Sequence, residues 1–179
     1  MKQLFLFFFS AAILFSSASA QSVRQLRKTI ELKMPKGPGD NGGTVAQNGK
    51  NRYFYATVAG NKTYSLAYFN VVGEMMSPPD LALLADVRGL WYNPKTKQLE
   101  GNGYKDFGWF TYDLDKKGIP EKINIKKEGS NQPDANSAGV LNTDANEVLF
   151  LDGLNVVCYS TDGTDKRKSI QIHFGAMNI

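Results

Sequence analysis

The residues best suited to ligand binding lie in two neighbouring segments near the middle of the chain. They combine charged and aromatic side chains with several glycines nearby: Asp86, Arg88, Trp91, Tyr92, Asn102, Tyr104, Asp106 and Trp109. The faces of Trp and Tyr can stack on a sugar or another flat ligand, and Arg88 can bind a carboxylate or phosphate through two parallel hydrogen bonds. We therefore expect a ligand site here. The alternative is that both tryptophans are core aromatics and that Asp86 pairs with Arg88.

Catalysis would need a nucleophile beside a base, and the chain offers few candidates. Cys158 is the only cysteine and His173 the only histidine. Cys158 lies in an apolar, strand-like run, which is typical of a small buried hydrophobe and not of an activated thiolate. His173 lies on the polar side of an alternating run, and a single cysteine excludes an internal disulfide. We expect no catalytic residue.

Four aspartates in turn-like segments offer hard oxygen ligands for calcium. They are Asp113, Asp115, Asp162 and Asp165. No run of residues matches an EF-hand loop, and aspartates in turns usually cap backbone groups. One histidine and one cysteine make a poor ligand set for zinc. We expect neither a metal nor another cofactor, with calcium as the alternative.

The segments that must position these residues repeat along the chain. Asparagines recur at spacings of 45 and 49 residues, and each begins a polar turn: Asn48, Asn93 and Asn142. Tyrosines recur at spacings of 44 and 47, and each closes a strand-like run: Tyr68, Tyr112 and Tyr159. Glycines recur at spacings of 45 and 45, and each ends the turn after its tyrosine: Gly73, Gly118 and Gly163. Three marks in the same phase predict one structural unit used three times.

Each unit of roughly 45 residues predicts four short strands. The asparagine turn joins the first two strands, the tyrosine ends the third, and the glycine turn leads into the fourth. Pairs of apolar residues separated by one position mark that fourth strand: residues 30–32, 123–125 and 170–172. One such unit cannot bury both of its faces, so it must stack on a neighbour.

Two pairs of segments carry a resemblance to known proteins: Gly89–Pro94 with Tyr112–Gly118, and Asn142–Asn146 with Tyr159–Gly163. In these segments the chain resembles β-propellers of the NHL, YVTN or kelch-like kind, and the resemblance covers about residues 28–175. The chain lacks a WD dipeptide and the paired glycines of a kelch blade, and its first copy lacks the aspartate before the glycine. The resemblance implies ligand binding around a central channel, at the start of the innermost strands.

We therefore predict an all-β fold of tandem four-stranded antiparallel repeats, a partial or small β-propeller. The repeats span about residues 44–87, 88–136 and 137–179, after an N-terminal strand and flexible connector over residues 21–43. A propeller usually closes with about four to eight blades, and this chain supplies three. Three explanations compete: a piece of a longer propeller, association of copies to complete a ring, or a β-sandwich or open stack of sheets.

Residues 1–20 have the three parts of a cleavable secretory signal peptide. Met1–Gln3 is a short basic start, Leu4–Phe15 is apolar except for Ser10, and an Ala-x-Ala spacing ends at Ala20. The apolar run is shorter than the roughly 20 residues that span a bilayer. We expect a periplasmic or secreted protein with no stable membrane span. The alternative is an N-terminal membrane anchor.

The mild charge argues against nucleic-acid binding. The chain carries 21 Lys and Arg against 17 Asp and Glu, a formal net charge of +4, and its basic residues are scattered. We expect a non-enzymatic binding or scaffold module of the cell envelope or secreted space, whose ligand is a protein or a glycan. One alternative is a metal-dependent hydrolase or lyase that resembles propeller lactonases, with first candidates at Asp86, Asn102, Asp106 and Asn142. The other is a structural piece of a larger ring.

Overall fold

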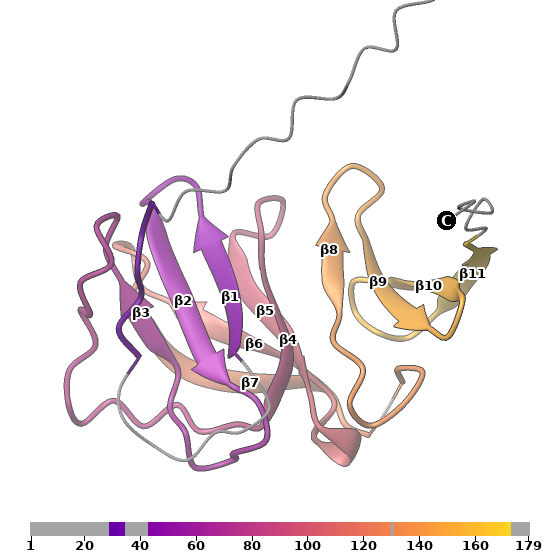
Figure 1. The fold of residues 1–179 in the computed structure, drawn as a ribbon, viewed down its shortest axis with the longest axis horizontal. Coiled ribbons are helices and arrows are strands. Elements are labelled where there is room, and N and C mark those ends of the chain that lie inside the picture. Colours follow the sequence, from indigo (N-terminus) through magenta and orange to yellow (C-terminus); the bar gives the residue numbers. More distant parts are fainter. Residues whose placement is uncertain (1–28, 35–42, 130, 173–179) are drawn as a thin grey trace, which may run out of the picture.

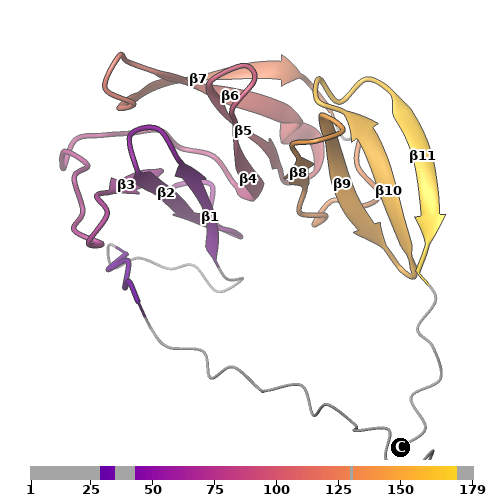
Figure 2. The same cartoon turned by 90° about the horizontal axis from the view of Figure 1, so that it is seen from above.

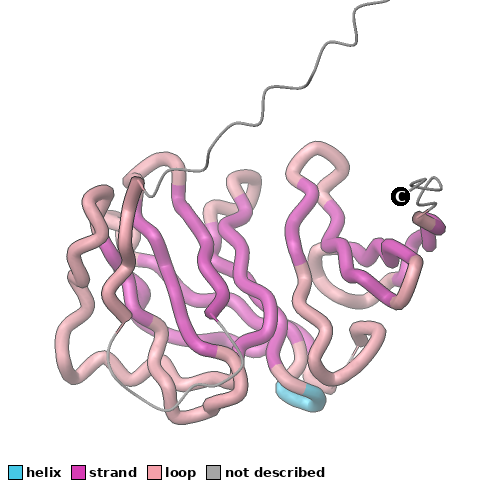
Figure 3. The backbone as a smooth tube through the Cα atoms, in the orientation of Figure 1, coloured by secondary structure: helices cyan, strands magenta, loops and turns pink. Residues whose placement is uncertain are grey.

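The computed structural model describes residues 29–34, 43–129 and 131–172, and these residues form an all-β fold (Figure 1). Eleven strands in these residues make three antiparallel sheets, which confirms the prediction of an all-β fold of antiparallel strands. One 3₁₀ turn, η1 (Lys105–Phe107), interrupts the second sheet and is drawn in cyan in Figure 3. No helix in these residues is long and apolar enough to cross a membrane. The predicted signal peptide lies outside the described residues, as does most of the predicted connector.

Each sheet is an up-and-down arrangement of strands that follow one another in the sequence. The first sheet contains β1 (Gly43–Asn48), β2 (Tyr53–Val58) and β3 (Ala67–Phe69). The second contains β4 (Val87–Asn93), β5 (Gln98–Gly103), β6 (Trp109–Leu114) and β7 (Pro120–Lys127). The third contains β8 (Val140–Asn142), β9 (Glu147–Asp152), β10 (Asn155–Ser160) and β11 (Lys166–Gln171). The predicted pattern of four antiparallel strands is therefore found in the second and third sheets.

The first sheet has three strands, so the prediction of four strands in every repeat is wrong there. After β3 the chain returns only as an isolated bridge between Phe69 and Met75. Pro78 and Pro79 follow closely, and proline has no N–H to donate to a strand ladder. Residues 30–32, predicted as a strand, form none. This N-terminal segment instead packs against the cluster around Phe69.

The recurring asparagines mark one turn that is used three times, as predicted. Asn48, Asn93 and Asn142 are the last residues of β1, β4 and β8. Each side-chain oxygen accepts a hydrogen bond from the backbone N–H two residues on, at 3.0, 3.0 and 3.2 Å. The residue four positions on has a positive φ in every copy: Arg52 (61°), Lys97 (60°) and Asn146 (55°). An asparagine that holds its own turn fixes each hairpin locally.

The recurring glycines are equivalent as well. Gly73, Gly118 and Gly163 have φ angles of 87°, 88° and 73°, a conformation that glycine adopts without steric cost. Each donates its N–H to the carbonyl three residues earlier, at 3.1, 3.0 and 2.9 Å. At Gly118 an added Cβ would collide with the side chain of Asn51. The spacing of 45 residues therefore reflects one tight turn repeated in all three sheets.

The tyrosines are equivalent in only two of the three copies. Tyr112 lies opposite Leu99, and Tyr159 lies opposite Val148. Leu99 and Val148 are each the second residue of the strand that follows the asparagine turn. In the first sheet the second residue of that strand is Phe54, and it lies opposite Phe69. Tyr68 lies opposite the third residue, Tyr55. A shift of one residue along a strand moves a side chain to the other face of the sheet. Tyr68 therefore points towards the second sheet, whereas Phe69 packs on the opposite side.

The three sheets fan out from a shared line of first strands. β1 lies beside β4, and β4 lies beside β8 (Figure 2). The core between the first and second sheets includes Tyr55, Leu66, Tyr68, Leu90, Leu99, Phe110 and Tyr112. The core between the second and third sheets comprises Trp91, Trp109, Val148, Phe150, Val157 and Tyr159. The second sheet is thus covered on both faces.

Candidate functional site

The structure separates the eight predicted ligand residues into three groups. Asp86, Arg88 and Tyr104 lie together near the start of β4. Trp91, Asn102 and Trp109 are buried inside the molecule. Tyr92 lies near the end of β4, and Asp106 is on η1. The first group alone forms a cluster beside an open pocket.

Asp86 and Arg88 form an ion pair, as the alternative prediction had it. An Arg88 guanidinium nitrogen lies 3.1 Å from Asp86 Oδ2, and the Arg88 side chain is 8% exposed. The other carboxylate oxygen accepts the Gly60 backbone N–H at 2.8 Å. The Arg88 guanidinium lies 4.7 Å from the centre of the Tyr104 ring, within reach of a cation–π interaction. These contacts pair the two charges and hold the guanidinium against the Tyr104 ring. Arg88 Nε is buried without a hydrogen-bond partner among the described residues, and Arg88 is not part of the lining of the neighbouring pocket.

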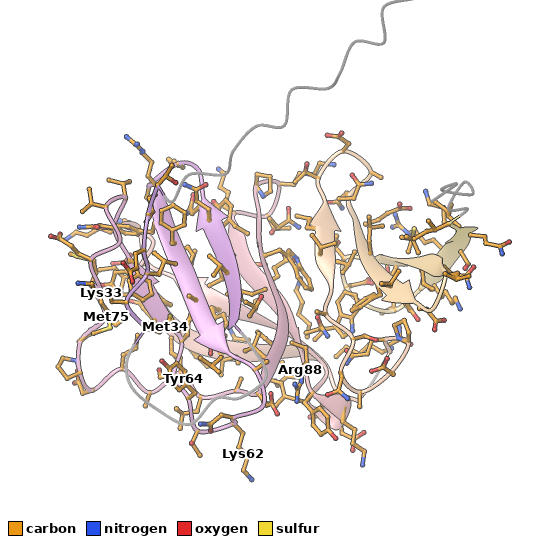
Figure 4. All side chains as sticks on the ribbon, viewed as in Figure 1. Lys33, Met34, Lys62, Tyr64, Met75 and Arg88 are labelled. Atoms are coloured by element: carbon orange, nitrogen blue, oxygen red, sulfur yellow. The ribbon has the colours of Figure 1, made fainter. Side chains whose placement is uncertain are left out.

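A pocket of about 620 Å³ opens beside this cluster. Its lining consists of Gly60, Lys62, Leu84, Ala85, Asp86, Tyr104 and Phe107. Tyr104 is 40% exposed and supplies an accessible ring, and Phe107 adds a second one. Figure 4 shows Arg88 and Lys62 at the lower end of the sheets, away from the hairpin loops at the top. Lys62 and Phe107 are not among the ligand residues predicted from the sequence. Lys62 comes from the first repeat, and nothing in the sequence places it beside Tyr104.

The two tryptophans are core residues, so the prediction that they stack on a ligand is wrong. Trp109 is 1% exposed and Trp91 is 5% exposed, and their rings meet edge to face at 5.9 Å. The Trp91 indole N–H donates to the buried carboxylate of Glu100 at 3.1 Å. The Trp109 ring also contacts Phe150 of the third sheet, with 5.5 Å between ring centres. Both tryptophans lie on the side of the second sheet that the third sheet covers.

Asn102 is also closed to a ligand, because its amide is fully used inside the protein. The side-chain nitrogen donates to Gln132 Oε1 at 2.9 Å and to the Ser137 carbonyl at 2.7 Å. The side-chain oxygen accepts the Gly139 N–H at 2.9 Å. Asn102 therefore fastens the connection between β7 and β8 onto the second sheet, and its predicted ligand role is a structural one instead.

The remaining two predicted residues lie apart from the pocket lining. The Asp106 side chain is 77% exposed and lies 3.9 Å from the ammonium group of Lys105. Tyr92 is half-buried and lines two other cavities at the opposite end of β4. The structure thus keeps Asp86 and Tyr104 of the predicted set in the pocket, with Arg88 behind them.

No protein-family model matches the chain, and no curated protein matches it at a significant level.

Two of the four aspartates considered as calcium ligands, Asp115 and Asp162, cap turns, whereas Asp113 lies within β6 and not in a turn. Asp115 accepts the backbone N–H groups of Lys117 and Ile119, each at 2.8 Å. Asp162 accepts the Ser160 hydroxyl at 2.5 Å and the Thr164 N–H at 3.0 Å, and these hydrogen bonds lower its pKa to about 2. Within the described ranges, no three His, Cys, Asp or Glu side chains come together to hold a metal ion.

Cys158 is buried in β10, as predicted. Burial raises the pKa of its thiol, and the nearby Glu147 carboxylate raises it further. Both effects keep the thiol protonated, which opposes nucleophilic chemistry. His173 lies outside the described residues.

The lining of the pocket beside Asp86 combines one carboxylate, two aromatic rings and one lysine. Asp86 is the single carboxylate in the described lining, and each of its oxygens already accepts a hydrogen bond. Two aromatic rings offer flat apolar surface, and the Lys62 ammonium group adds one positive charge. A ring-shaped or apolar ligand with a negative substituent fits this combination.

Proposed function

We propose that this protein is an exported binding module with β-propeller-like blades, and that it acts in the cell envelope or secreted space. The observation that carries the proposal is the tandem arrangement of three up-and-down sheets whose first strands lie side by side (Figure 2). The repeated asparagine turn gives each sheet the same first hairpin, which supports a common blade. Export rests on the signal-like residues 1–20.

The ligand we propose for the pocket beside Asp86 is a glycan that carries an acidic group. Exposed aromatic rings such as Tyr104 present a flat surface on which a sugar ring can lie. Lys62 can pair with a carboxylate or sulfate on that sugar. The ion pair of Asp86 with Arg88 holds the Tyr104 ring from behind, so the aromatic surface is in place before the ligand arrives.

A glycan array probed with the chain lacking residues 1–20 tests this ligand. We expect binding to acidic glycans, and we expect Tyr104→Ala and Lys62→Gln each to weaken it by roughly tenfold, which corresponds to one lost contact of about 1.4 kcal/mol. Lys122→Gln removes an exposed lysine of β7 and serves as the matched control. Silence across the array, or equal binding by Tyr104→Ala, would show that the pocket has another role.

The outer face of the third sheet is where we propose that a second copy of the chain packs. Strand pairing places five aliphatic side chains, together with the buried Cys158, on the side away from the second sheet: Val140, Leu149, Leu151, Val156 and Ile170. Leu151 is 64% exposed and Ile170 is 51% exposed. On the second sheet, the corresponding side is the one that the third sheet covers. Two copies of three blades would give a ring of six, within the usual range of about four to eight.

In such a ring the third sheet of one copy meets the first sheet of the other. Leu32 and Met34, which pack on the outer side of the first sheet, would lie within that contact. Sedimentation across a concentration series is expected to show a dimer that Leu151→Glu converts to a monomer. Val72→Glu, which changes an equally exposed valine in a turn, is expected to leave the dimer intact. A monomer at every concentration, or a dimer that tolerates Leu151→Glu, would rule this contact out.

A further inference from the structure

Two adjoining cavities lie at the end of the inner strands opposite the Asp86 pocket. Their volumes are about 480 and 430 Å³, and both are lined by Lys50, Tyr92 and Lys97. The first cavity also touches Thr143, so all three asparagine hairpins contribute to it. The loops of these hairpins lie together at the top of Figure 1. The second cavity extends to the turn between β6 and β7, which carries Lys116 and Lys117.

The lining of these cavities has a clear excess of positive charge. Four lysines face one carboxylate, that of Asp115. In the described part of the chain, the lysines that form ion pairs with carboxylates are Lys105, Lys126 and Lys168, none of which lines these cavities. The four lysines of the lining thus form no ion pair with a carboxylate of the described residues.

Three side-chain oxygens of the same lining already accept backbone N–H groups. Asp115 Oδ1 accepts two backbone N–H groups at 2.8 Å each. Asn48 Oδ1 accepts the Lys50 N–H at 3.0 Å, and Asn51 Oδ1 accepts the Tyr53 N–H at 3.1 Å. The four lysine ammonium groups of the lining are donors only and outnumber its single carboxylate, so they favour an anion.

The backbone that carries the lysines is fixed across two sheets. The Asn51 side chain donates to the Lys117 carbonyl at 3.0 Å, and the Tyr55 hydroxyl donates to the Gly118 carbonyl at 2.7 Å. These bonds fasten the β6–β7 turn to the first hairpin. Lys50 and Lys97 lie in the self-capped hairpins, whose geometry repeats. A ligand would therefore order flexible lysine side chains but would not need to rearrange the backbone.

We propose that the joined cavities bind a ligand with two linked oxyanion groups, phosphates or sulfates. Lys50 and Lys97 lie between the two cavities and can contact both groups, and Lys116 and Lys117 can contact the group in the second cavity. Lysine acts as a point charge without the planar geometry of arginine, so charge and spacing decide the affinity. The site is on the surface, so salt weakens the binding.

Isothermal titration at low ionic strength tests the site with inorganic pyrophosphate, orthophosphate and a disulfated disaccharide. We expect pyrophosphate or the disulfated sugar to bind roughly tenfold more tightly than orthophosphate, because the second charge adds a second set of ion pairs. The tighter of the two identifies the source of the oxyanions. Amide NMR signals of Tyr92 and of both hairpin lysines are expected to shift on binding, and added salt is expected to reverse the shifts.

Two double variants separate a built site from general attraction to a basic protein. Lys50→Gln with Lys97→Gln removes the two shared lysines, and it is expected to lower the affinity for the tighter ligand by roughly tenfold or more. Lys122→Gln with Lys127→Gln removes the same charge from β7, away from the cavities, and is expected to leave the affinity unchanged. Equal losses in both variants, or no binding of any of the three probes by the folded wild type, would overturn the proposal.

Discussion

The second and third sheets share a hairpin register but differ in what covers them. Among the described residues, the second sheet lies between two neighbouring sheets, whereas the third has a sheet on one side only. Counting from the hairpin, Glu100 and Asn102 of the second sheet correspond to Leu149 and Leu151 of the third. The polar pair is fully buried and the apolar pair faces outward. At these two positions, burial follows the stacking order of the sheets and not the polarity of the side chain.

Glu100 shows how a covered face accepts a charge. Its carboxylate receives hydrogen bonds from the Trp91 indole at 3.1 Å and the Thr96 hydroxyl at 2.9 Å, and it lies 3.2 Å from the Lys126 ammonium group. A buried carboxylate is tolerated when it is paired and hydrogen-bonded in this way. The corresponding Leu149 needs no such partners, and it leaves the third sheet ready for an apolar neighbour.

The largest expected effect tests whether a side chain contributes more to the free energy of unfolding when a neighbouring sheet covers it. Trp109→Ala would open a cavity between the second and third sheets and is expected to reduce the free energy of unfolding by roughly 3–5 kcal/mol. Leu151→Ala, on the outer face, is expected to cost under about 1 kcal/mol for the isolated chain. Urea unfolding below the concentration of any association measures both. Similar losses would mean that the two faces are equally covered.

The next effect concerns the polar residue that anchors the connection between these sheets. Asn102→Ala would leave the Gly139 N–H and the Ser137 carbonyl without their buried partner, which is expected to cost roughly 2–3 kcal/mol. Asn70→Ala, in an exposed turn of the first sheet, is the matched control with an expected cost of about 1 kcal/mol. Hydrogen exchange of the Gly139 amide should rise strongly in the first variant alone, and an unchanged exchange rate would count against this role.

The features predictable from the sequence are those that one short segment determines. Asn93 holds its own turn and Gly118 requires its own φ angle, so both recur visibly along the chain. The face on which Tyr68 lies depends on its pairing with β2. The sequence predicts that Tyr68 is equivalent to Tyr112 and Tyr159, and this prediction is wrong by one residue. Trp109 is of a residue type that often binds ligands, and only the packing of the third sheet against it shows that it is a core residue. The meeting of Lys50 with distant lysines likewise depends on how the hairpins assemble.

A smaller effect compares two buried tyrosine hydroxyls between the first and second sheets. The Tyr55 hydroxyl donates to the Gly118 carbonyl at 2.7 Å, so Tyr55→Phe is expected to cost about 1 kcal/mol. The Tyr112 hydroxyl is buried and has no hydrogen-bond partner among the described residues, so Tyr112→Phe is expected to be neutral or slightly stabilising. Urea unfolding of both variants gives the comparison directly, and a larger loss for Tyr112→Phe would place an unseen partner at that hydroxyl.

The smallest effect concerns the turn that closes the third sheet. Hydrogen bonds from Ser160 and Thr164 lower the pKa of Asp162 to about 2, below its usual value of 3.8. A carboxyl group with a lowered pKa in the folded state stabilises the fold above its unfolded-state pKa, and that contribution disappears as the pH falls from about 4 to 2. Because Asp162 is exposed, the loss is expected to be at most about 1 kcal/mol. Asp162→Asn should therefore lower the stability at pH 6 and shrink the difference between pH 6 and pH 2, whereas Asp144→Asn, in the β8–β9 loop, should retain the wild-type difference. If both variants behave alike, the Ser160 contact does not hold the turn, and the outer edge of the third sheet is secured by its strand pairing alone.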